Sequence, residues 1–405
     1  MRIHVSVEID GRTRPAGTLY ATARRGVVTS TFTYDTAYLE SPEAYELDPE
    51  LPLVAGTLPV TAPLPRAFSD AAPDRWGRYL INRRLTARAR REERATRTLT
   101  DVDYLLEVGD ATRQGALRFH TEPEGPFQHP SAPIPPLVEL PELLAAARLA
   151  VTDTTGAEAD EAIALLLKLG SASLGGARPK ASVVDGDTLH IAKFPHPADE
   201  WNVIAWEAVA LDLAEAAGIT VPPHRLIWLD DAPILLAQRF DRQGTTRLGY
   251  MSAMTLCGAT DGQPGDYLDI ADRLAAISAD PTADLIELWR RIAFSIAINN
   301  TDDHLRNHGV IRTKQGWRLS PVFDINPSPQ IGAPRATAIG GETAPEAGMT
   351  ALLETSELFG LDKGEASAAL EEIDAGLSEW RRIASSHNLA MSEQTRFTEI
   401  IDRKK

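Results

Sequence analysis

The first residues of the chain alternate between hydrophobic and polar positions. The odd-numbered residues of segment 3–9 are Ile or Val, and an Asp-Gly pair follows them. Residues 27–34 are again rich in β-branched and aromatic side chains. A period of two places apolar side chains on one face of a strand, so this pattern predicts a small β-sheet. The pattern becomes helical after residue 69, and we expect a first domain over residues 1–119.

A dense group of prolines follows this first domain. Residues 120–141 contain seven prolines. Proline lacks a backbone N–H donor and has a fixed φ, so this density favours an extended connector over a helix or a central strand. We therefore place a domain boundary within residues 120–141.

The remaining chain changes from a mixed pattern to a mainly helical one. In residues 142–264 we expect two helices, a β-hairpin, a third helix and two strands, at residues 142–151, 158–169, 181–194, 202–217, 221–229 and 233–240. Most of residues 265–405 has the apolar spacing of helices. The whole pattern predicts an α+β fold with a mainly helical C-terminal lobe.

The composition is that of a soluble globular protein with more than one core. The chain has 405 residues, of which 43% are hydrophobic and 24% charged. It contains no run of about 18 apolar residues and does not begin with an apolar secretion signal, so we expect a cytoplasmic protein without a membrane span. Cys257 is the only cysteine, which excludes an internal disulfide and a Cys-rich zinc site.

The formal net charge of −16 opposes tight binding of nucleic acid by the chain alone. One segment differs, because residues 75–97 contain nine arginines on a predicted helix. These arginines form either a solvated helix face or a docking surface for nucleic acid or an acidic partner.

A glycine-rich segment precedes the predicted hairpin. Gly170 and Gly175 have the spacing of a Walker A loop, but Gly176 and Ala177 replace the Lys-Ser/Thr pair that such a loop requires. The segment is therefore either a structural turn or a different kind of phosphate-binding loop, since glycine lets backbone N–H groups approach an anion closely.

Lys193 lies on the strand that returns from the hairpin, and Glu207 lies on the apolar stripe of the next predicted helix. A carboxylate on an apolar stripe needs a cation. A pair between Lys193 and Glu207 would match the strand lysine and helix glutamate that orient nucleotide phosphates in protein kinases.

Three oxygen-bearing side chains follow a predicted apolar helix. Asp302 and Asn307 have the Asp-x-x-x-x-Asn spacing of a kinase catalytic loop, and Asp324 ends an apolar stretch that we expect to be a short strand. Their hard oxygen donors suit Mg²⁺ rather than zinc. His304 is expected to stabilise the loop by hydrogen bonds, whereas Asp303 has no evident role and, like His304, could simply be solvated.

Taken in order, these segments resemble the HipA family of bacterial serine/threonine kinase toxins. The resemblance spans nearly the whole chain and rests on the motifs FSDAAPDRWGR, GALRF, SLGGARPK, AAGITVP, LAQRFDR and NTDDHLRN, together with Lys193, Glu207 and Asp324. It implies a bilobal, protein-kinase-like fold in which residues 1–119 form a β-rich N-terminal subdomain, residues 142–264 the nucleotide-binding part and residues 265–405 the catalytic helical lobe.

The resemblance also implies roles for individual residues. Asp302 would be the catalytic base, assisted by Lys193 and Glu207, and Asn307 and Asp324 would hold Mg²⁺. ATP would contact Lys193, Gly175, Gly176, Lys180, Gln238 and Phe240. Ser173 or Ser171 would be autophosphorylated, which is thought to silence the kinase in this family.

The partners are implied in the same way. The resemblance implies a protein substrate, translation-related by analogy, and a helix-turn-helix antitoxin of the HipB kind that supplies the contact with DNA. Two other functions stay open: a small-molecule phosphotransferase on the same fold, and a non-catalytic module that binds an antitoxin. Two departures are notable: Gln238 stands where a relative can have Glu, and Ile325 and Asn326 follow Asp324 where ordinary kinases have Phe-Gly.

Overall fold

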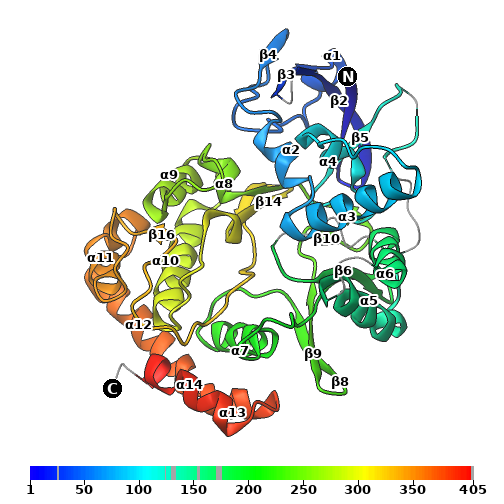
Figure 1. Cartoon of the computed structure of the whole chain (residues 1–405). Coiled ribbons are helices and arrows are strands. Elements are labelled where there is room, and N and C mark those ends of the chain that lie inside the picture. The colour runs from blue at the N-terminus through cyan, green and yellow to red at the C-terminus, as the bar shows by residue number, and fades with distance from the viewer. Residues whose placement is uncertain (25–26, 124, 129–133, 153–155, 170–175, 403–405) are drawn as a thin grey trace. The chain divides into compact units, whose positions relative to one another are not determined.

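The computed structural model describes residues 1–24, 27–123, 125–128, 134–152, 156–169 and 176–402. The chain divides into two compact units (Figure 1). Unit 1 contains residues 1–198 and 241–251, and unit 2 contains residues 199–240 and 252–405. The chain therefore passes from unit 2 back to unit 1 for one short segment.

The N-terminal part of unit 1 is the predicted sheet. Its five antiparallel strands are arranged in the order β4-β3-β2-β1-β5. They are β1 (Arg2–Ile9), β2 (Arg12–Arg24), β3 (Val27–Tyr34), β4 (Thr57–Pro59) and β5 (Leu117–His120). Phe32, Phe68 and Phe119 are fully buried, and the ring of Phe68 lies 5.7 Å from Phe32 and 5.3 Å from Phe119. This aromatic contact joins the sheet to the helix that contains Phe68.

Four helices accompany the sheet: α1 (Thr36–Leu39), α2 (Arg66–Asp70), α3 (Arg75–Arg91) and α4 (Asp101–Glu107). The α3 helix begins where the Asp74 carboxylate accepts the N–H of Gly77 at 2.7 Å, an ordinary N-cap. It ends at Arg91, earlier than the expected helix over residues 75–97, and Glu93 has a positive φ of 48°.

The rest of unit 1 contains the predicted pair of helices and hairpin. The elements are η1 (Leu137–Glu139), α5 (Leu140–Thr152), α6 (Ala157–Lys168), β6 (Lys180–Asp185), β7 (Thr188–Lys193), β10 (Arg242–Gln243) and β11 (Thr246–Arg247), with β12 (Tyr250–Ser252) at the boundary of the units. Helix α5 begins inside the proline-rich segment, because Pro141 occupies its first turn, where the missing N–H is not needed. Strands β6 and β7 pair from Lys180 with Lys193 to Asp185 with Thr188, as expected for a hairpin.

Unit 2 begins with α7 (Val203–Ala216), followed by the hairpin of β8 (His224–Leu229) and β9 (Ala232–Gln238). The α7 helix is buried over most of its surface, and its Trp206 packs on Phe397 with ring centroids 3.8 Å apart. The hydrophobic stretch predicted to be a strand through residue 240 ends its pairing at Gln238.

The remainder of unit 2 is mainly helical, as expected. Its helices are α8 (Ala253–Leu256), α9 (Tyr267–Ile277), α10 (Pro281–Ala297), η2 (Leu305–Asn307), α11 (Gly348–Glu354), η3 (Ser356–Phe359), α12 (Lys363–Leu377), α13 (Trp380–Ser386) and α14 (Met391–Ile401), and its short strands are β13 (Gly265–Asp266), β14 (Gly309–Thr313), β15 (Gly316–Leu319) and β16 (Thr337–Ala338). Helices α9 and α11 both pack against α10 (Figure 1).

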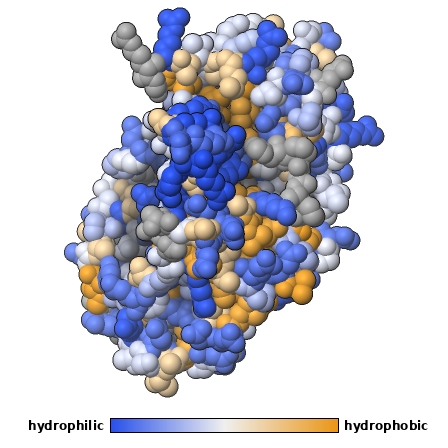
Figure 2. Space-filling model, turned by 45° about the vertical axis from the view of Figure 1, so that its right-hand side comes forward, coloured by the Kyte–Doolittle hydropathy of each residue, from blue (hydrophilic) through white to orange (hydrophobic). Residues whose placement is uncertain are grey.

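The molecular face in Figure 2 is mostly hydrophilic, with smaller hydrophobic areas between the polar side chains. Within the described ranges, none of the helices combines the length and the apolar character that a membrane crossing requires.

Candidate functional site

The loop that follows α10 contains the predicted catalytic residues. Helix α10 ends at Ala297, and Asn299 then takes a positive φ of 54°, which turns the chain out of the helix. The backbone carbonyl of Asp302 accepts the N–H of His304 and the side-chain amide of Asn307, each at 3.0 Å. Asp302 is exposed, whereas Asn307 is only 7% exposed. The loop therefore has a fixed backbone and presents the Asp302 side chain at the surface of unit 2.

Asp303, for which the sequence indicated no role, is the buried centre of this loop. Its carboxylate accepts hydrogen bonds from the hydroxyls of Tyr267 at 2.5 Å and Ser295 at 2.7 Å, and it lies 2.9 Å from Nε2 of His308. Burial alone would raise the pKa of Asp303, but His308 and the two hydroxyls outweigh it and lower the pKa to about 2. Asp303 is thus an ionised, fully bonded carboxylate that joins α9, α10 and the loop.

His304 supports the loop by hydrogen bonds of its backbone, because its N–H donates to the carbonyl of Asp302 at 3.0 Å and its carbonyl accepts the N–H of Asn307 at 2.8 Å. Nδ1 of His304 is buried and has no hydrogen-bond partner among the described residues. His308 also supports the loop, because its Nε2 lies 2.9 Å from the Asp303 carboxylate. The sequence signal was present but ambiguous, since both histidines follow Asp303 within five positions.

Asp324 lies in a segment that hydrogen bonds hold against the same loop. The side-chain amide of Asn299 donates to the carbonyls of Ser328 and Gln330, both at 2.8 Å. Further along the chain, the N–H of Ala336 donates to the carbonyl of Thr301 at 2.9 Å. The structure therefore joins the loop of Asp302 and Asn307 to the segment that starts at Asp324.

The expected short strand ending at Asp324 is absent from this described segment, because β15 already ends at Leu319. Asp324 instead has a left-handed backbone with a φ of 59°, and the Asn326 side chain donates to its carbonyl at 3.2 Å. Asp and Asn tolerate this conformation better than bulky residues. Ile325, at the position of the kinase phenylalanine, is buried.

The donor chemistry of Asn307 and Asp324 fits a magnesium ion. The amide nitrogen of Asn307 already donates to Asp302, so its oxygen is the atom left to act as a ligand. Carboxylate and amide oxygens are hard donors of the kind that Mg²⁺ binds. Among the described residues, no group of three or more His, Cys, Asp or Glu side chains could hold a metal ion. Because Mg²⁺ prefers octahedral coordination, an ion at Asn307 and Asp324 would take phosphate oxygens or water as further ligands.

The predicted adenine-binding segment lies at the end of β9. The N–H of Gln238 donates to the carbonyl of Pro223 at 2.8 Å, which keeps this residue in line with the hairpin. The ring of Phe240 lies 5.4 Å from that of Phe323, directly before Asp324 in the chain. Unit 2 thus holds Phe240, the end of the predicted hinge, close to the segment of Asp324.

Lys193 and Glu207 lie in different units. Lys193 is the half-buried last residue of β7 in unit 1. Glu207 is 3% exposed and lies on the otherwise apolar α7 of unit 2. Its burial agrees with the expected position on the apolar stripe, and a carboxylate in such surroundings requires a compensating partner. The pair between Lys193 and Glu207 stays a prediction.

Part of the glycine-rich segment, including Ser171, Ser173 and Gly175, lies outside the described residues. Gly176 is exposed and has a φ of 102°, a conformation that favours glycine. Its carbonyl accepts the N–H of Trp76 at 3.3 Å. The described end of the loop is therefore bonded to the first turn of α3.

Lys180 strengthens this connection. It is 3% exposed, its Nζ lies 3.1 Å from the Asp74 carboxylate, and its carbonyl accepts the indole N–H of Trp76 at 3.3 Å. Its predicted contact with nucleotide stays a prediction, and the contact that the structure provides is an ion pair with the N-terminal subdomain. Sequence reasoning missed Asp74 and Trp76 as positioning residues, although both lie in the first motif of the family resemblance.

At least six of the nine arginines in residues 75–97 form ion pairs with described residues of the chain. The pairs are Arg78 with Asp101, Arg84 with Glu107, Arg88 and Arg94 with Glu92, Arg91 with Asp160 and Arg97 with Asp103. A positive charge that is already paired contributes less to binding a polyanion. These contacts favour the solvated, structural interpretation of the basic helix.

Comparison with known proteins gives matches over both parts of the chain. Residues 7–120 match the family model described as HipA N-terminal domain, and residues 172–380 match that described as HipA-like C-terminal domain. The Sinorhizobium fredii protein named "Putative kinase Y4mE" is 27% identical over 179 residues, which are 38% of this chain and 41% of that protein. The alignment thus spans about two fifths of that curated relative.

A solved structure shares the fold over nearly the full length. It is the Shewanella oneidensis MR-1 HipA from a complex with HipB and operator DNA, with a TM-score of 0.68 and 16% identity, covering 99% of this chain and 96% of that one. The expected α+β, bilobal, kinase-like fold is confirmed by this similarity.

Proposed function

This chain belongs to the HipA family, and from that premise we propose that it is an ATP- and Mg²⁺-dependent serine/threonine protein kinase that acts as a toxin. The observation that carries the proposal is the loop of residues 299–307, in which a buried Asp303 fixes the backbone beneath an exposed Asp302 and a nearly buried Asn307. Such a preorganised loop is what phosphoryl transfer needs, because its catalysis rests on positioning and charge stabilisation.

In the proposed reaction, Asp302 accepts the proton of the substrate hydroxyl. The hydroxyl oxygen forms a bond with the γ-phosphorus of ATP while the bond to the leaving ADP oxygen breaks. Asn307 and Asp324 would hold Mg²⁺, which neutralises charge on the phosphates when it is bound. Lys193, oriented by Glu207, would contact the phosphates, and Gln238 to Phe240 would border the adenine. Asp302 is exposed, so it is accessible to a substrate hydroxyl.

Regulation and partners are part of the proposal. Ser173 or Ser171 would receive phosphate from the chain itself, and the added negative charge would be repelled by the phosphates of ATP. The solved Shewanella HipA occurs with HipB and operator DNA, which supports a helix-turn-helix antitoxin as partner of this chain as well. The net charge of −16 and the internally paired arginines fit a chain that contacts DNA mainly through such a partner.

Intact-mass spectrometry after incubation with Mg²⁺ and ATP tests this proposal. We expect wild type to gain one phosphate on Ser173 or Ser171, and Asp302→Gln to lose about 10²- to 10⁴-fold of the rate, as is typical when a general base is removed. Asp261→Asn is the matched control, because Asp261 is exposed and pairs with Arg306 of the same loop. The control should react like wild type.

The possible outcomes separate the candidate functions. Phosphorylation of a small molecule with no phosphate on any protein would favour the small-molecule phosphotransferase. ATP binding without transfer to any acceptor, together with equal toxicity of wild type and Asp302→Gln in cells, would contradict the kinase proposal and favour the non-catalytic antitoxin-binding module.

A further inference from the structure

The segment of residues 241–251 belongs to unit 1, although β9 before it and α8 after it belong to unit 2. It begins directly after Phe240, the last residue of the predicted adenine hinge. Within the segment, Arg242 pairs with Arg247 and Gln243 with Thr246 in a two-stranded hairpin. The chain thus has only two residues, Arg239 and Phe240, between the end of β9 and this hairpin segment.

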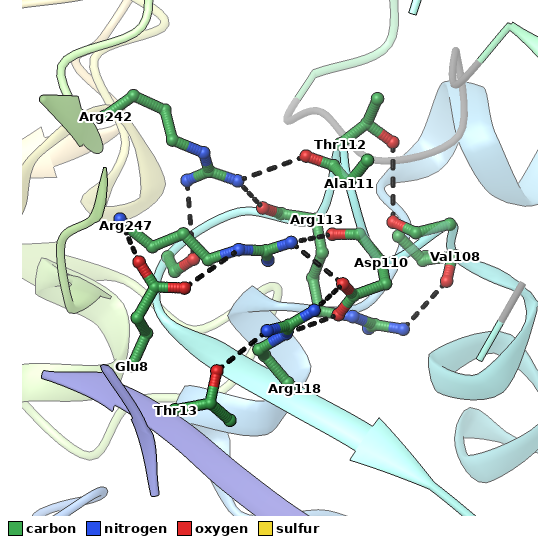
Figure 3. Close-up of polar contacts among 12 residues, drawn as sticks. Glu8, Thr13, Val108, Asp110, Ala111, Thr112, Arg113, Arg118, Arg242 and Arg247 are labelled. Carbon is green, nitrogen blue, oxygen red and sulfur yellow. Dashed lines mark hydrogen bonds and ion pairs between the residues drawn. The ribbon is translucent and has the colours of Figure 1, made fainter. Parts of the chain in front are cut away.

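Asp241 and Arg242 hold the start of this segment on the N-terminal subdomain. The buried Asp241 carboxylate accepts the backbone N–H of Gly115 at 2.8 Å and the Arg242 guanidinium at 2.7 Å. Arg242 also donates to the carbonyl of Arg113 at 2.6 Å and, at longer distances of 3.4 and 3.5 Å, to those of Gly115 and Ala111 (Figure 3). One acidic and one basic side chain therefore bind the whole turn that precedes β5.

Arg247 holds the far side of the hairpin. Its backbone N–H donates to the Glu8 carboxylate at 2.8 Å, and its guanidinium donates to the carbonyl of Asp110 at 2.6 Å and to the Asp110 carboxylate at 3.0 Å. The same carboxylate accepts two hydrogen bonds from Arg118 of β5 (Figure 3). The hairpin segment is thus bonded to Glu8 of β1 and to Asp110, which also binds Arg118 of β5.

The backbone of the turn also fits the segment closely. Gly115 has a φ of 74°, and a Cβ at this position would lie 3.4 Å from Cβ and from the backbone nitrogen of Tyr250. A side chain at Gly115 would therefore be strained by its own backbone, and its Cβ would be in van der Waals contact with the segment. Charge pairs, carbonyl contacts and shape all specify one position for residues 241–251.

We propose that Asp241 and Arg242 are positioning residues for the nucleotide hinge, through which the N-terminal subdomain determines the affinity for ATP. Within unit 2, the residues before and in the hinge are held by the β8–β9 hairpin and the Phe240–Phe323 contact. Directly after Phe240, the chain is held by Asp241 and its contacts in unit 1. The inference rests on the proposed kinase function and extends it, because it gives the N-terminal subdomain a part in nucleotide binding.

Asp241 and Arg242 would act on the hinge by fixing the position of the residues beside it. Paired buried charges contribute little net stability compared with apolar packing, but they specify one arrangement, since a displaced carboxylate or guanidinium is left unpaired. Without Arg242, the Asp241 carboxylate loses the guanidinium that lies 2.7 Å from it, and the turn at Gly115 loses a donor. The two residues before Asp241 then lose their fixed end, and the affinity for adenine falls.

The test measures nucleotide binding and turnover on the full chain. The dissociation constant for a fluorescent N-methylanthraniloyl ATP with Mg²⁺, and KM and kcat for autophosphorylation, are compared in wild type, Arg242→Ala, Arg242→Lys and Asp241→Asn. The matched control is Arg14→Ala, because Arg14 forms an exposed ion pair with Glu43 in the same subdomain. Glu8→Gln provides a milder variant at the opposite side of the hairpin, should Arg242→Ala fail to fold.

We expect Arg242→Ala to raise the dissociation constant and KM about tenfold, with kcat within about threefold of wild type, because misplacement of a binding group weakens nucleotide affinity. Arg242→Lys should recover part of the affinity, since it keeps the charge beside Asp241 and loses the forked donor. Glu8→Gln should raise KM by less.

A merely structural role would lower the melting temperature and the active fraction while leaving KM and the dissociation constant unchanged, and that result would overturn the inference. A shift of the same size in Arg14→Ala would overturn it too. If wild type binds the nucleotide but transfers no phosphate, the proposed function fails, and the dissociation constants alone decide the inference.

Discussion

Removal of the Asp303 carboxylate is the sharpest perturbation of the candidate site, because three partners depend on it. The hydroxyls of Tyr267 and Ser295 and the ring of His308 all lie within 2.9 Å of the buried carboxylate. In Asp303→Ala these buried groups lose their common acceptor, and each such loss costs about 1–3 kcal/mol. Breaking a buried ion pair costs roughly 3–5 kcal/mol, which we take as the expected total destabilisation.

The lowered pKa of Asp303 gives an independent value for the free energy by which its negative charge stabilises the folded state. The pKa of Asp303 falls from its ordinary value of 3.8 to about 2, which corresponds to roughly 2 kcal/mol of stabilisation at 1.36 kcal/mol for each pH unit. Because the folded pKa is the lower one, this stabilisation is present above about pH 4 and is lost as the pH falls toward 2. Asp303→Asn, which keeps the volume and one acceptor oxygen, should therefore be destabilised by about 2 kcal/mol at pH 7.

Thermal unfolding and phosphotransfer measure the two consequences. For a unit of this size, Asp303→Ala should lower the melting temperature by roughly 10 °C. At temperatures well below the transition, autophosphorylation should also fall at least about tenfold, because Asp302 and Asn307 lie on the loop that Asp303 holds. Asp261→Asn, which removes an exposed partner of Arg306, should change the stability by no more than about 1 kcal/mol.

The reasoning is refuted if Asp303→Ala melts within about 2 °C of wild type. Loss of a buried carboxylate that has three bonding partners should lower the free energy of unfolding by more than such a small shift indicates. It is also wrong if Asp303→Asn shows the same decline in stability between pH 4 and pH 2 as wild type, because that decline would then come from other carboxylates.

Two further predictions concern other buried charges. Lys180→Met should destabilise the protein by about 3 kcal/mol, because it removes the buried cation 3.1 Å from the Asp74 carboxylate. Calorimetry beside the exposed control Lys168→Met would show no difference if the pair were unimportant. The Asp212 carboxylate lies 2.9 Å from Nε2 of His224 and 2.6 Å from Nε2 of His387, joining α7, β8 and the end of α13. Burial lowers the pKa of His224, but Asp212 outweighs it and raises the pKa above 6.5. The resulting stability is complete below pH 6.5 and is lost as the pH rises through the raised value. The melting temperature of wild type should therefore exceed that of His224→Gln by more at pH 6 than at pH 8.5, and an equal difference at both pH values would exclude this linkage.

Local patterns in the sequence were sufficient to predict most of the helices and strands. The strands of residues 2–9 and 27–34, the hairpin of β6 and β7, and helix α7 were predicted because their apolar spacing and turn residues lie within a few positions of one another. The errors occurred at ends of elements. Helix α3 stops at Arg91, where Glu93 takes a positive φ of 48°, and β15 stops at Leu319, after which the N–H of Ser320 donates to the carbonyl of Gly309.

The residue types of the candidate site were also available from spacing. Asp302, Asn307 and Asp324 have the order of a kinase loop and its second metal ligand, and hard oxygen donors indicate Mg²⁺ from chemistry alone. Their roles as base and metal ligands, like those of Lys193 and Glu207, remain predictions that the proposed experiments address.

By itself the sequence determined the α+β architecture and the apolar stripe on which Glu207 is buried. It also determined which oxygen-bearing side chains the loop of residues 299–307 carries. Each of these depends on the order of neighbouring residues. Only the tertiary structure decided which side chains support that chemistry. Asp303 is a buried acceptor because Tyr267 and Ser295 come to it from two helices. Asp241 and Arg242 meet the turn at Gly115 across more than a hundred residues of chain. Such contacts depend on how distant segments pack, and packing is a property of the whole fold rather than of any local spacing.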